Sequence, residues 1–213
     1  MEAALEATRT ALVHHDDSVP GRLMTSAIAL FARKGYAATT VREIVEAAGV
    51  TKPVLYYHFG SKEGIFLAMM GEALREFEAT ATGALGTRGS AEERILRFFD
   101  SMFALMLEHL DVMRVLEAIY YGPPQGAPFF DFEVIHKRFI EILGRLIREG
   151  VESGEFRPGD PDDLTWAILG PFEVVRGMSF SHPEMDFGRD TLARLLKVVF
   201  EGLRAAHEKE LVQ

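Results

Sequence analysis

Cysteine is absent from the 213 residues of the chain, and so is any long apolar run. Without cysteine there are no disulfide bonds or thiolate metal sites, which agrees with a reducing compartment. The longest uncharged run, Ala118 to Phe130, contains three prolines and two glycines, whereas a membrane-spanning helix needs about 20 apolar residues. The N-terminus lacks the basic-then-apolar pattern of a secretion signal. These absences predict a soluble, cytoplasmic protein with no membrane partner.

Catalytic and metal-binding motifs are missing as well. The sequence has no glycine-rich phosphate loop, no His-Glu-x-x-His and no Gly-x-Ser-x-Gly. Its seven histidines are scattered without the spacing of metal ligands. The acidic pairs Glu92-Glu93 and Asp162-Asp163 fall at predicted helix starts, where they complement the helix dipole. We therefore expect no catalytic residue, no metal site and no cofactor. A small-molecule enzyme remains a third alternative.

Basic residues are concentrated in one part of an acidic chain. The whole sequence carries a net charge of −9. Residues 18–62, however, hold six lysines and arginines against two glutamates, a net charge of +4. This distribution is typical of a protein that contacts nucleic-acid phosphates with one end only. Chance clustering of surface charge is the alternative, and it loses weight once the motif in this stretch is considered.

The basic stretch contains the signals of two short helices around a tight turn. Thr40 and Glu43 form a capping box, which satisfies backbone donors at the start of the first helix. Gly49 follows the last apolar position of that helix, where a positive φ is often needed. Thr51 caps the second helix, and Pro53 is tolerated in its first turn because the N–H groups there have no intrahelical partner. The pattern predicts a helix-turn-helix.

The second helix has two different faces. Val54, Leu55 and Phe59 anchor it, and the opposite face is basic and aromatic. In a helix-turn-helix, the N-terminal part of the second helix reads base edges in the major groove. The candidate DNA contacts are Thr40, Arg42, Thr51, Lys52, Pro53, Tyr56, Tyr57, His58 and Lys62. For Tyr56, packing into the core is the alternative.

The run from Thr40 to Lys62 resembles the DNA-binding domain of the tetracycline-repressor (TetR) family of bacterial transcription regulators. Tyr-Tyr-His-Phe at 56–59 and Ser-Lys-Glu at 61–63 carry the likeness, which covers about residues 20–68. The resemblance implies that Tyr57, His58 and Lys62 grip the DNA backbone. One departure is Val45, which stands where the family usually has alanine.

The rest of the chain predicts further helices and no strand. Caps, glycines and apolar periodicity place helices at about 20–34, 61–81, 91–108, 111–120, 130–153, 161–179 and 187–208. With the two helices of the turn, the fold class is all-α with about nine helices. We expect an N-terminal arm at 1–18, a helix-turn-helix domain at 19–62, and a ligand-binding and dimerisation domain at 63–213.

The last two helices are the natural place for a dimer interface. Apolar residues recur on them every three to four positions, as in a four-helix bundle formed by two chains. The candidate interface residues are Ile168, Phe172, Val175, Leu192, Leu195, Val199 and Leu203. The alternative is that these stripes close the core of each monomer, and both uses can hold in part.

Aromatic residues and methionines gather in the middle helices, and most of them must form the core. Some could line a site for an apolar or amphipathic small molecule, because these side chains repack around varied shapes. The candidate ligand-binding residues are Phe99, Met102, Phe103, Met106, Met113, Glu117, Tyr120, Phe139, Trp166, Glu173 and Arg176. Glu173 and Arg176 could instead pair with each other across one helical turn.

The sequence therefore predicts a homodimeric regulator that binds a double-stranded, near-palindromic DNA operator. We expect a repressor that a largely apolar small-molecule effector releases from the operator. The alternative is a helical dimer whose N-terminal head binds a protein partner rather than DNA.

Overall fold

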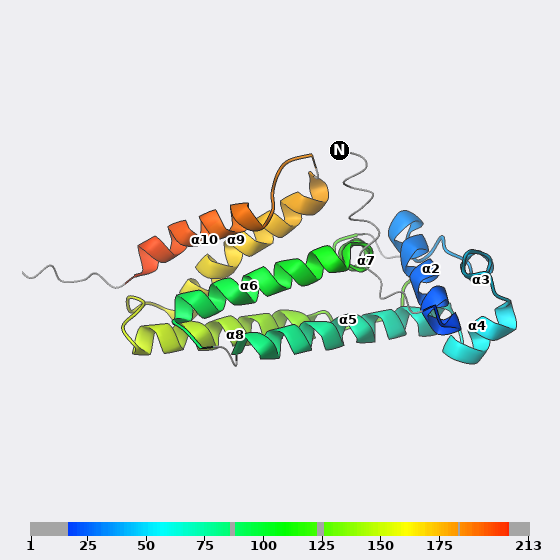
Figure 1. Cartoon of the computed structure of the whole chain (residues 1–213), viewed down its shortest axis with the longest axis horizontal. Helices are drawn as coiled ribbons and strands as arrows, with labels where there is room; N and C mark the ends of the chain where they lie inside the picture. The colour runs from blue at the N-terminus through cyan, green and yellow to red at the C-terminus, as the bar shows by residue number, and fades with distance from the viewer. Residues whose placement is uncertain (1–16, 86–87, 123–125, 183, 205–213) are drawn as a thin grey trace, which may run out of the picture. The chain divides into compact units, whose positions relative to one another are not determined.

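A computed structural model describes residues 17–85, 88–122, 126–182 and 184–204 (Figure 1). These ranges contain nine α-helices and no strand beyond one isolated bridge between Phe156 and Arg204, so the all-α prediction is confirmed. The helices are α2 (Val19–Lys34), α3 (Val41–Ala48), α4 (Lys52–Phe59), α5 (Lys62–Leu85), α6 (Ala91–Glu108), α7 (Leu110–Tyr120), α8 (Glu133–Glu152), α9 (Pro161–Ser181) and α10 (Arg189–Leu203). The N-terminal arm predicted at 1–18 lies outside the described ranges except for its last two residues.

Helix starts follow the caps that the sequence predicts. Asp160 accepts hydrogen bonds from the backbone N–H groups of Asp162 and Asp163, and Pro161 opens α9. Pro171 lies inside α9, which continues through it. Two other boundaries differ from the prediction. α5 runs four residues beyond its predicted end at 81, and α8 begins at Glu133 rather than at about 130.

The chain divides into two compact units; two of the three divisions fall inside α5 and α6, and the third falls directly before α8. Of the described residues, unit 1 comprises those up to Phe77 together with those from Ala104 to Phe132. Unit 2 comprises the described residues from Glu78 to Phe103 together with those from Glu133 to Arg204. α5 and α6 therefore both contribute to each unit.

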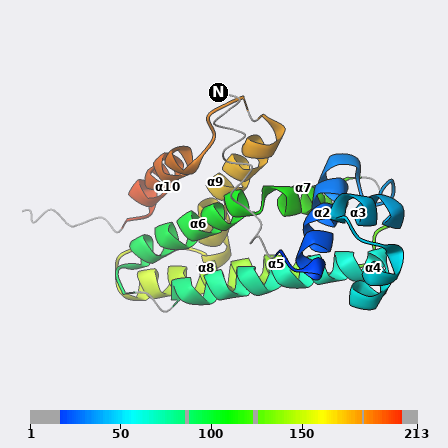
Figure 2. The ribbon, with the colours of Figure 1, turned by 45° about the vertical axis from the view of Figure 1, so that its right-hand side comes forward.

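Unit 1 builds its core around α2, α3, α4 and the start of α5, helices whose ribbons lie together in Figure 2. Leu23 and Phe31 of α2, Ile44 of α3 and Leu55 of α4 are buried together in this core. Ile65 and Phe66 of α5 and Val115 of α7 join the same cluster. The side chain of Val45 is also buried there. The helix-turn-helix therefore shares one hydrophobic core with α5 and α7.

Unit 2 packs α8, α9 and α10 with the first part of α6, and α9 and α10 run side by side (Figures 1 and 2). The turn after α8 is fixed by Phe156, whose ring stacks on Phe200 at 5.8 Å between centroids. Glu155 of the same turn accepts hydrogen bonds from the backbone N–H groups of Ala91 and Glu92, at 2.7 and 2.8 Å. This carboxylate caps the N-terminus of α6 from a distant part of the chain, where its charge complements the helix dipole.

Candidate nucleic-acid interface

The capping box at the start of α3 forms as predicted. Thr40 Oγ1 accepts a hydrogen bond from the backbone N–H of Glu43 at 3.3 Å, and the Glu43 carboxylate accepts from the backbone N–H of Thr40 at 2.9 Å. At the other end of α3, Gly49 adopts the left-handed conformation with φ of 65°. A side chain at this φ is strained, so glycine makes the sharp turn from α3 into α4 possible.

Glu43 also connects α3 to α2. Lys34, in the last turn of α2, donates a hydrogen bond to Glu43 Oε1 at 2.5 Å. This bond from Lys34, followed by those from the Thr40 side chain and backbone, lowers the pKa of Glu43 from 4.5 to about 2. The carboxylate is therefore ionised at neutral pH and holds the N-terminus of α3 against α2.

α4 exposes one face along its whole length. Leu55 is its one buried residue, and Val54 and Phe59 are half-buried against the same core. The opposite face presents the predicted reading residues, and the side chain of Tyr57 is 85% exposed. The exposed candidates are Thr51, Lys52, Pro53, Tyr56, Tyr57 and His58. Tyr56 is half exposed and does not join the buried core, so its predicted alternative of core packing is not what the structure shows.

Thr51 occupies the N-cap position of α4 without acting as a side-chain cap. Its backbone is extended, with φ of −106° and ψ of 159°, but its hydroxyl makes no capping hydrogen bond. The prediction that Thr51 caps this helix is correct in position and wrong in its side-chain contact. The hydroxyl is exposed beside Lys52 and Pro53 at the end of α4 that reads bases in helix-turn-helix proteins.

Arg42 is an exposed residue in the first turn of α3. Its Nε donates to Glu46 Oε1 at 2.7 Å, and this hydrogen bond and the charge of Glu46 raise the pKa of Arg42. Its side chain is 75% exposed. An exposed ion pair of this kind contributes little to stability, so the guanidinium can exchange Glu46 for a phosphate.

Lys62, a predicted contact to the DNA backbone, is tied into the protein. Its ammonium donates to the carbonyl oxygens of Tyr36 and Thr39, both at 2.8 Å. It also lies 4.1 Å from the centre of the Tyr36 ring. Burial, with a smaller effect of the Lys34 charge, lowers the pKa of Lys62. Because an ammonium has three donors, one remains for another acceptor, but the main contacts of Lys62 are to the loop that precedes α3.

Two residues that support this surface were not among the candidates. Tyr36 is buried, and its ring packs against Phe66 at 5.3 Å between centroids, which places its carbonyl near Lys62. Arg22 donates from Nε to the carbonyl of Ala48 at 3.3 Å, at the C-terminus of α3. The sequence signal that could have indicated Tyr36 is its aromatic side chain directly after Gly35, the residue that ends α2.

The candidate ligand-binding residues fall into both units. Unit 1 holds Met106, Met113, Glu117 and Tyr120, and unit 2 holds Phe99, Met102, Phe103, Phe139, Trp166, Glu173 and Arg176. In unit 2, Phe99 lies 5.1 Å from Phe172 and 6.1 Å from Phe139, centroid to centroid. These rings form a packed aromatic cluster.

Glu173 and Arg176 pair with each other, which is the predicted alternative to ligand binding. Arg176 Nη2 donates to Glu173 Oε2 at 2.6 Å. Burial raises the pKa of Glu173 and lowers that of Arg176. Trp166 is 55% exposed, with its ring 5.8 Å from that of His136. Trp166 thus lies on the surface of unit 2.

Most of the candidate interface residues close the core of unit 2. Ile168, Phe172, Val175, Leu192 and Leu203 are buried within the chain itself, which leaves little of their surface for a partner. Leu195 is exposed and Val199 is half-buried. Further apolar side chains on the same two helices are exposed, namely Val174 at 54% and Val198 at 67%.

The described part of the chain contains neither a candidate membrane-spanning helix nor a candidate cluster of metal-binding side chains. No helix there combines the length and apolar character that crossing a bilayer requires. Within the same ranges, no three histidine or acidic side chains gather closely enough to hold a metal ion.

The chain is similar to known bacterial regulatory proteins. The profile "Bacterial regulatory proteins, tetR family" matches residues 23–69. The HTH-type transcriptional repressor KstR2 of Mycolicibacterium smegmatis is 33% identical over 152 residues, which cover 69% of this chain and 72% of the repressor. The structure of the ketosteroid transcriptional regulator KstR2 of Mycobacterium tuberculosis matches with a TM-score of 0.69 and 24% identity, over 92% of this chain and all of that one.

A further solved structure matches most of the chain. The TetR-family regulator PfmR of Thermus thermophilus is 26% identical and matches with a TM-score of 0.66, over 88% of this chain and all of that one. The matched profile contains the capping box, the turn at Gly49 and the exposed face of α4. The chain therefore belongs to the TetR family, and it is a DNA-binding transcriptional repressor.

Proposed function

We propose that the protein represses transcription as a homodimer that inserts α4 of each chain into the major groove of a near-palindromic operator. The observation that carries the proposal is the exposed face of α4, where six candidate residues lie together above a single buried anchor, Leu55. One such helix reads only a few base pairs, so a useful specificity requires two of them on related half-sites. The functional division into a head at 19–62 and a body at 63–213 is part of this proposal.

In this arrangement the contacts have separate tasks. Lys52 can donate to guanine acceptors, and Pro53 or the Thr51 methyl group can contact a thymine methyl. Tyr57, His58 and Arg42 contact phosphates and fix the register of the protein on the duplex. The N-terminus of α3 adds backbone N–H groups, which favour a phosphate because the helix dipole is positive there.

Operator binding can be tested with a duplex selected from a random library. The affinity is measured by fluorescence anisotropy at several salt concentrations for the wild type, Lys52→Ala and Tyr57→Ala. Several phosphate contacts require the logarithm of the association constant to fall steeply with the logarithm of salt concentration. We expect both variants to weaken binding. A salt-independent affinity, or normal binding by both variants, would refute the proposed DNA surface and favour the alternative of a protein partner.

The dimer interface is proposed on the exposed apolar side chains of α9 and α10. Trp166 and Val174 on α9 and Leu195 and Val198 on α10 are the large apolar residues of these helices that the chain itself leaves exposed. Val199 adds a half-buried neighbour. Two helices from each chain would bury these side chains in a four-helix bundle.

A small apolar or amphipathic effector is proposed to release the operator. Support comes from the aromatic and methionine-rich interior and from the KstR2 relative, which is a ketosteroid regulator by its name. Because α5 and α6 belong to both units, a ligand that changes their packing can shift the population of DNA-binding conformations. A coupling of about 1–3 kcal/mol would weaken operator binding about 5- to 150-fold.

The effector proposal is tested by mass spectrometry of whatever copurifies with the protein, followed by titration of the operator complex with that compound and with a ketosteroid. We expect operator affinity to fall as the compound binds. Unchanged operator affinity in the presence of every tightly bound compound would contradict the release mechanism and leave the DNA surface unaffected.

A further inference from the structure

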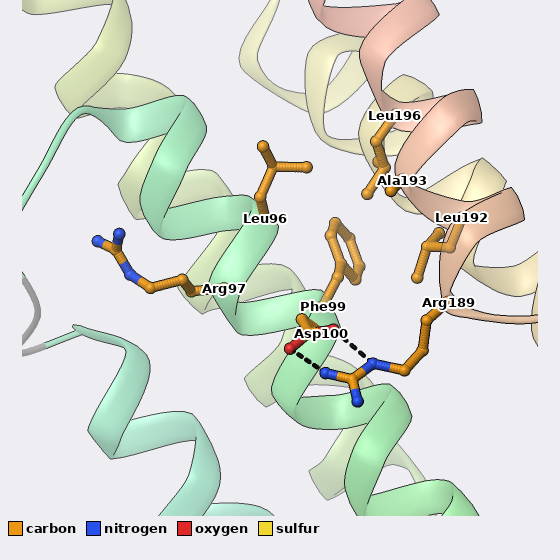
Figure 3. Close-up of a pocket in the computed structure, with 8 residues that line it drawn as sticks. All are labelled: Leu96, Arg97, Phe99, Asp100, Arg189, Leu192, Ala193 and Leu196. Carbon is orange, nitrogen blue, oxygen red and sulfur yellow. Dashed lines mark hydrogen bonds and ion pairs between the residues drawn. The ribbon is translucent and has the colours of Figure 1, made fainter.

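Unit 2 contains a second candidate site, a cavity between α6 and α10 (Figure 3). Its volume is about 280 Å³. The lining residues are Leu96, Arg97, Phe99 and Asp100 from α6 and Arg189, Leu192, Ala193 and Leu196 from α10. Of these, only Phe99 belongs to the candidate ligand-binding set.

The floor of the cavity is apolar and buried. Phe99, Leu192 and Leu196 are buried, and the Phe99 ring stacks on Phe172 at an interplanar angle of 28°. Leu96 and Ala193 complete the apolar wall, and Ala193 is exposed where the cavity opens. A small apolar body placed here would exchange water for contact with hydrocarbon on two sides.

One edge of the cavity carries a charged pair. Arg189 Nε donates to Asp100 Oδ1 at 2.7 Å, and Arg189 Nη2 donates to Asp100 Oδ2. Figure 3 shows this pair bridging α6 and α10 beside the apolar floor. Both side chains are about half exposed, at 50% and 52%. The pair is therefore accessible from solvent at the edge of the cavity.

The guanidinium of Arg189 has donors that Asp100 does not use. A guanidinium carries five N–H donors, and the pair engages only its Nε and Nη2 atoms. Within the described ranges, no other hydrogen bond of Arg189 is present. A carboxylate can bind bidentately to the remaining edge or replace Asp100, since Arg–carboxylate pairs are commonly two-pronged.

Arg97 contributes its side-chain stem to the lining, on the other side of α6 from Arg189. In Figure 3 its side chain extends away from the floor, and its guanidinium donates to the backbone carbonyl of Arg88. The guanidinium that faces the cavity is therefore that of Arg189. The charge of Asp190 also acts on Arg189, although Asp190 lies outside the lining. A ligand carboxylate at this edge must compete with Asp100 for Arg189.

From this arrangement we propose that the cavity binds a small amphipathic monocarboxylate, with its apolar body on the Phe99–Leu196 floor and its carboxylate on Arg189. The volume of about 280 Å³ lies just below the roughly 300–1,000 Å³ typical of ligand sites, which favours a short carboxylic acid over a larger ligand. The proposal concerns a site on one chain and does not depend on operator binding or on an interior effector.

The probe for the test is octanoate, and octan-1-ol is its uncharged control. Binding is followed by the NMR shifts of the Leu192 and Leu196 methyl groups in methyl-labelled protein, because these groups report on the cavity floor directly. We expect saturable shifts with octanoate and much weaker binding of octan-1-ol. Absence of shifts at both leucines, or equal binding of the two probes, would overturn the proposal.

Three variants separate the roles of the floor and the rim. Ala193→Leu adds a side chain at the exposed opening and should abolish the shifts caused by octanoate. Arg189→Gln should weaken octanoate binding about tenfold or more, as expected for the loss of one charge-assisted contact. Asp100→Asn removes a competing carboxylate and should tighten octanoate binding, a gain that a purely structural role of the ion pair does not predict.

Arg194→Gln is the matched control, since Arg194 is an exposed arginine of α10 outside the cavity lining. It should bind octanoate like the wild type. Thermal unfolding of each variant checks that the fold is kept. Equal effects of Arg189→Gln and Arg194→Gln, or wild-type binding by Ala193→Leu, would contradict the assigned site.

Discussion

The ammonium of Lys62 lies 4.1 Å from the centre of the Tyr36 ring and donates to the Tyr36 carbonyl at 2.8 Å, so one residue of α5 holds the turn between α2 and α3 by two kinds of contact. The second hydrogen bond of Lys62, to Thr39, ends directly before the N-cap residue of α3. We infer that Lys62 positions the N-terminus of α3 for its phosphate contact.

Replacing Lys62 with methionine should therefore lower stability. Methionine keeps an apolar chain of similar length, but it cannot donate to the Tyr36 and Thr39 carbonyls. We expect the free energy of unfolding to fall by about 1.5–3 kcal/mol, the range for hydrogen bonds to a charged group. Urea unfolding measures this change. Lys52→Met, at an exposed position on α4, should leave the unfolding midpoint nearly unchanged.

The Lys62→Met variant also distinguishes a Lys62 that positions α3 from a Lys62 that contacts a DNA phosphate directly. Removing a phosphate contact reduces the slope of log affinity against log salt by about one. Lys62→Met should weaken operator binding with little change in that slope. A slope reduced by a full unit in Lys62→Met would instead identify Lys62 as a phosphate contact.

The two N-cap threonines should respond differently to alanine. Thr40→Ala removes a formed capping box and should lower the free energy of unfolding by about 0.5–2 kcal/mol. Thr51→Ala should change the stability far less, because the Thr51 hydroxyl makes no capping bond, yet it should weaken operator binding. Chemical unfolding and anisotropy titration measure the two effects. Equal destabilisation by both substitutions would contradict the different roles.

Acid should weaken the connection between α2 and α3 through Glu43. The pKa of Glu43 is about 2 in the folded protein against 4.5 unperturbed. A lowered pKa means that the ionised carboxylate stabilises the fold above about pH 4.5, and that this contribution is lost as the pH falls toward 2. The stability difference between wild type and Glu43→Gln should therefore shrink over this interval.

Unfolding measured at pH 6, 4 and 3 tests the pH dependence, and Glu72→Gln on the surface of α5 provides the control. A difference between the wild type and Glu43→Gln that stays constant from pH 6 to pH 3 would show that the Glu43 carboxylate does not carry the effect. Destabilisation of Glu72→Gln to the same extent would point to a general charge effect.

A carboxylate at position 198 should dissociate the proposed dimer. Val198 is 67% exposed on α10, and Val198→Glu would place an unpaired charge in the apolar interface, where it loses hydration. We expect the dimer dissociation constant to rise at least about tenfold, which corresponds to about 1.4 kcal/mol. Sedimentation velocity over a range of protein concentrations measures it.

Lys197→Glu is the matched control, since it changes the charge by more at the neighbouring exposed position of the same helix. It should affect dimerisation less than Val198→Glu. An unchanged dimer in Val198→Glu would remove α10 from the proposed interface.

Local signals allowed much of the fold to be predicted from the sequence. The Thr40–Glu43 capping box and the positive φ at Gly49 depend on residues within one or two turns, and both form as expected. The two faces of α4 follow from helical periodicity alone. The all-α class was predictable for the same reason, because caps and apolar spacing are properties of short segments.

Contacts between distant residues were not predictable in this way. Lys62 meets a carbonyl 26 positions earlier, and nothing in the helical spacing indicates that carbonyl. The apolar stripes of α9 and α10 mark faces that must be covered, but periodicity does not reveal whether the same chain or a partner covers them. Ile168 and Leu192 are covered by their own chain, whereas Val174 and Val198 are not.

The shared core of unit 1 has a consequence for how this protein can be recombined. Val115 of α7 is buried with Leu23, Ile44 and Leu55 of the helix-turn-helix. Residues 19–62 therefore do not form a hydrophobic core that is separate from the rest of the chain. A chimera that takes residues 19–62 from a relative would bring a foreign surface onto α7. A new operator preference is therefore easier to obtain by changing the exposed face of α4, which contributes only Leu55 to the buried core, than by exchanging the head as a block.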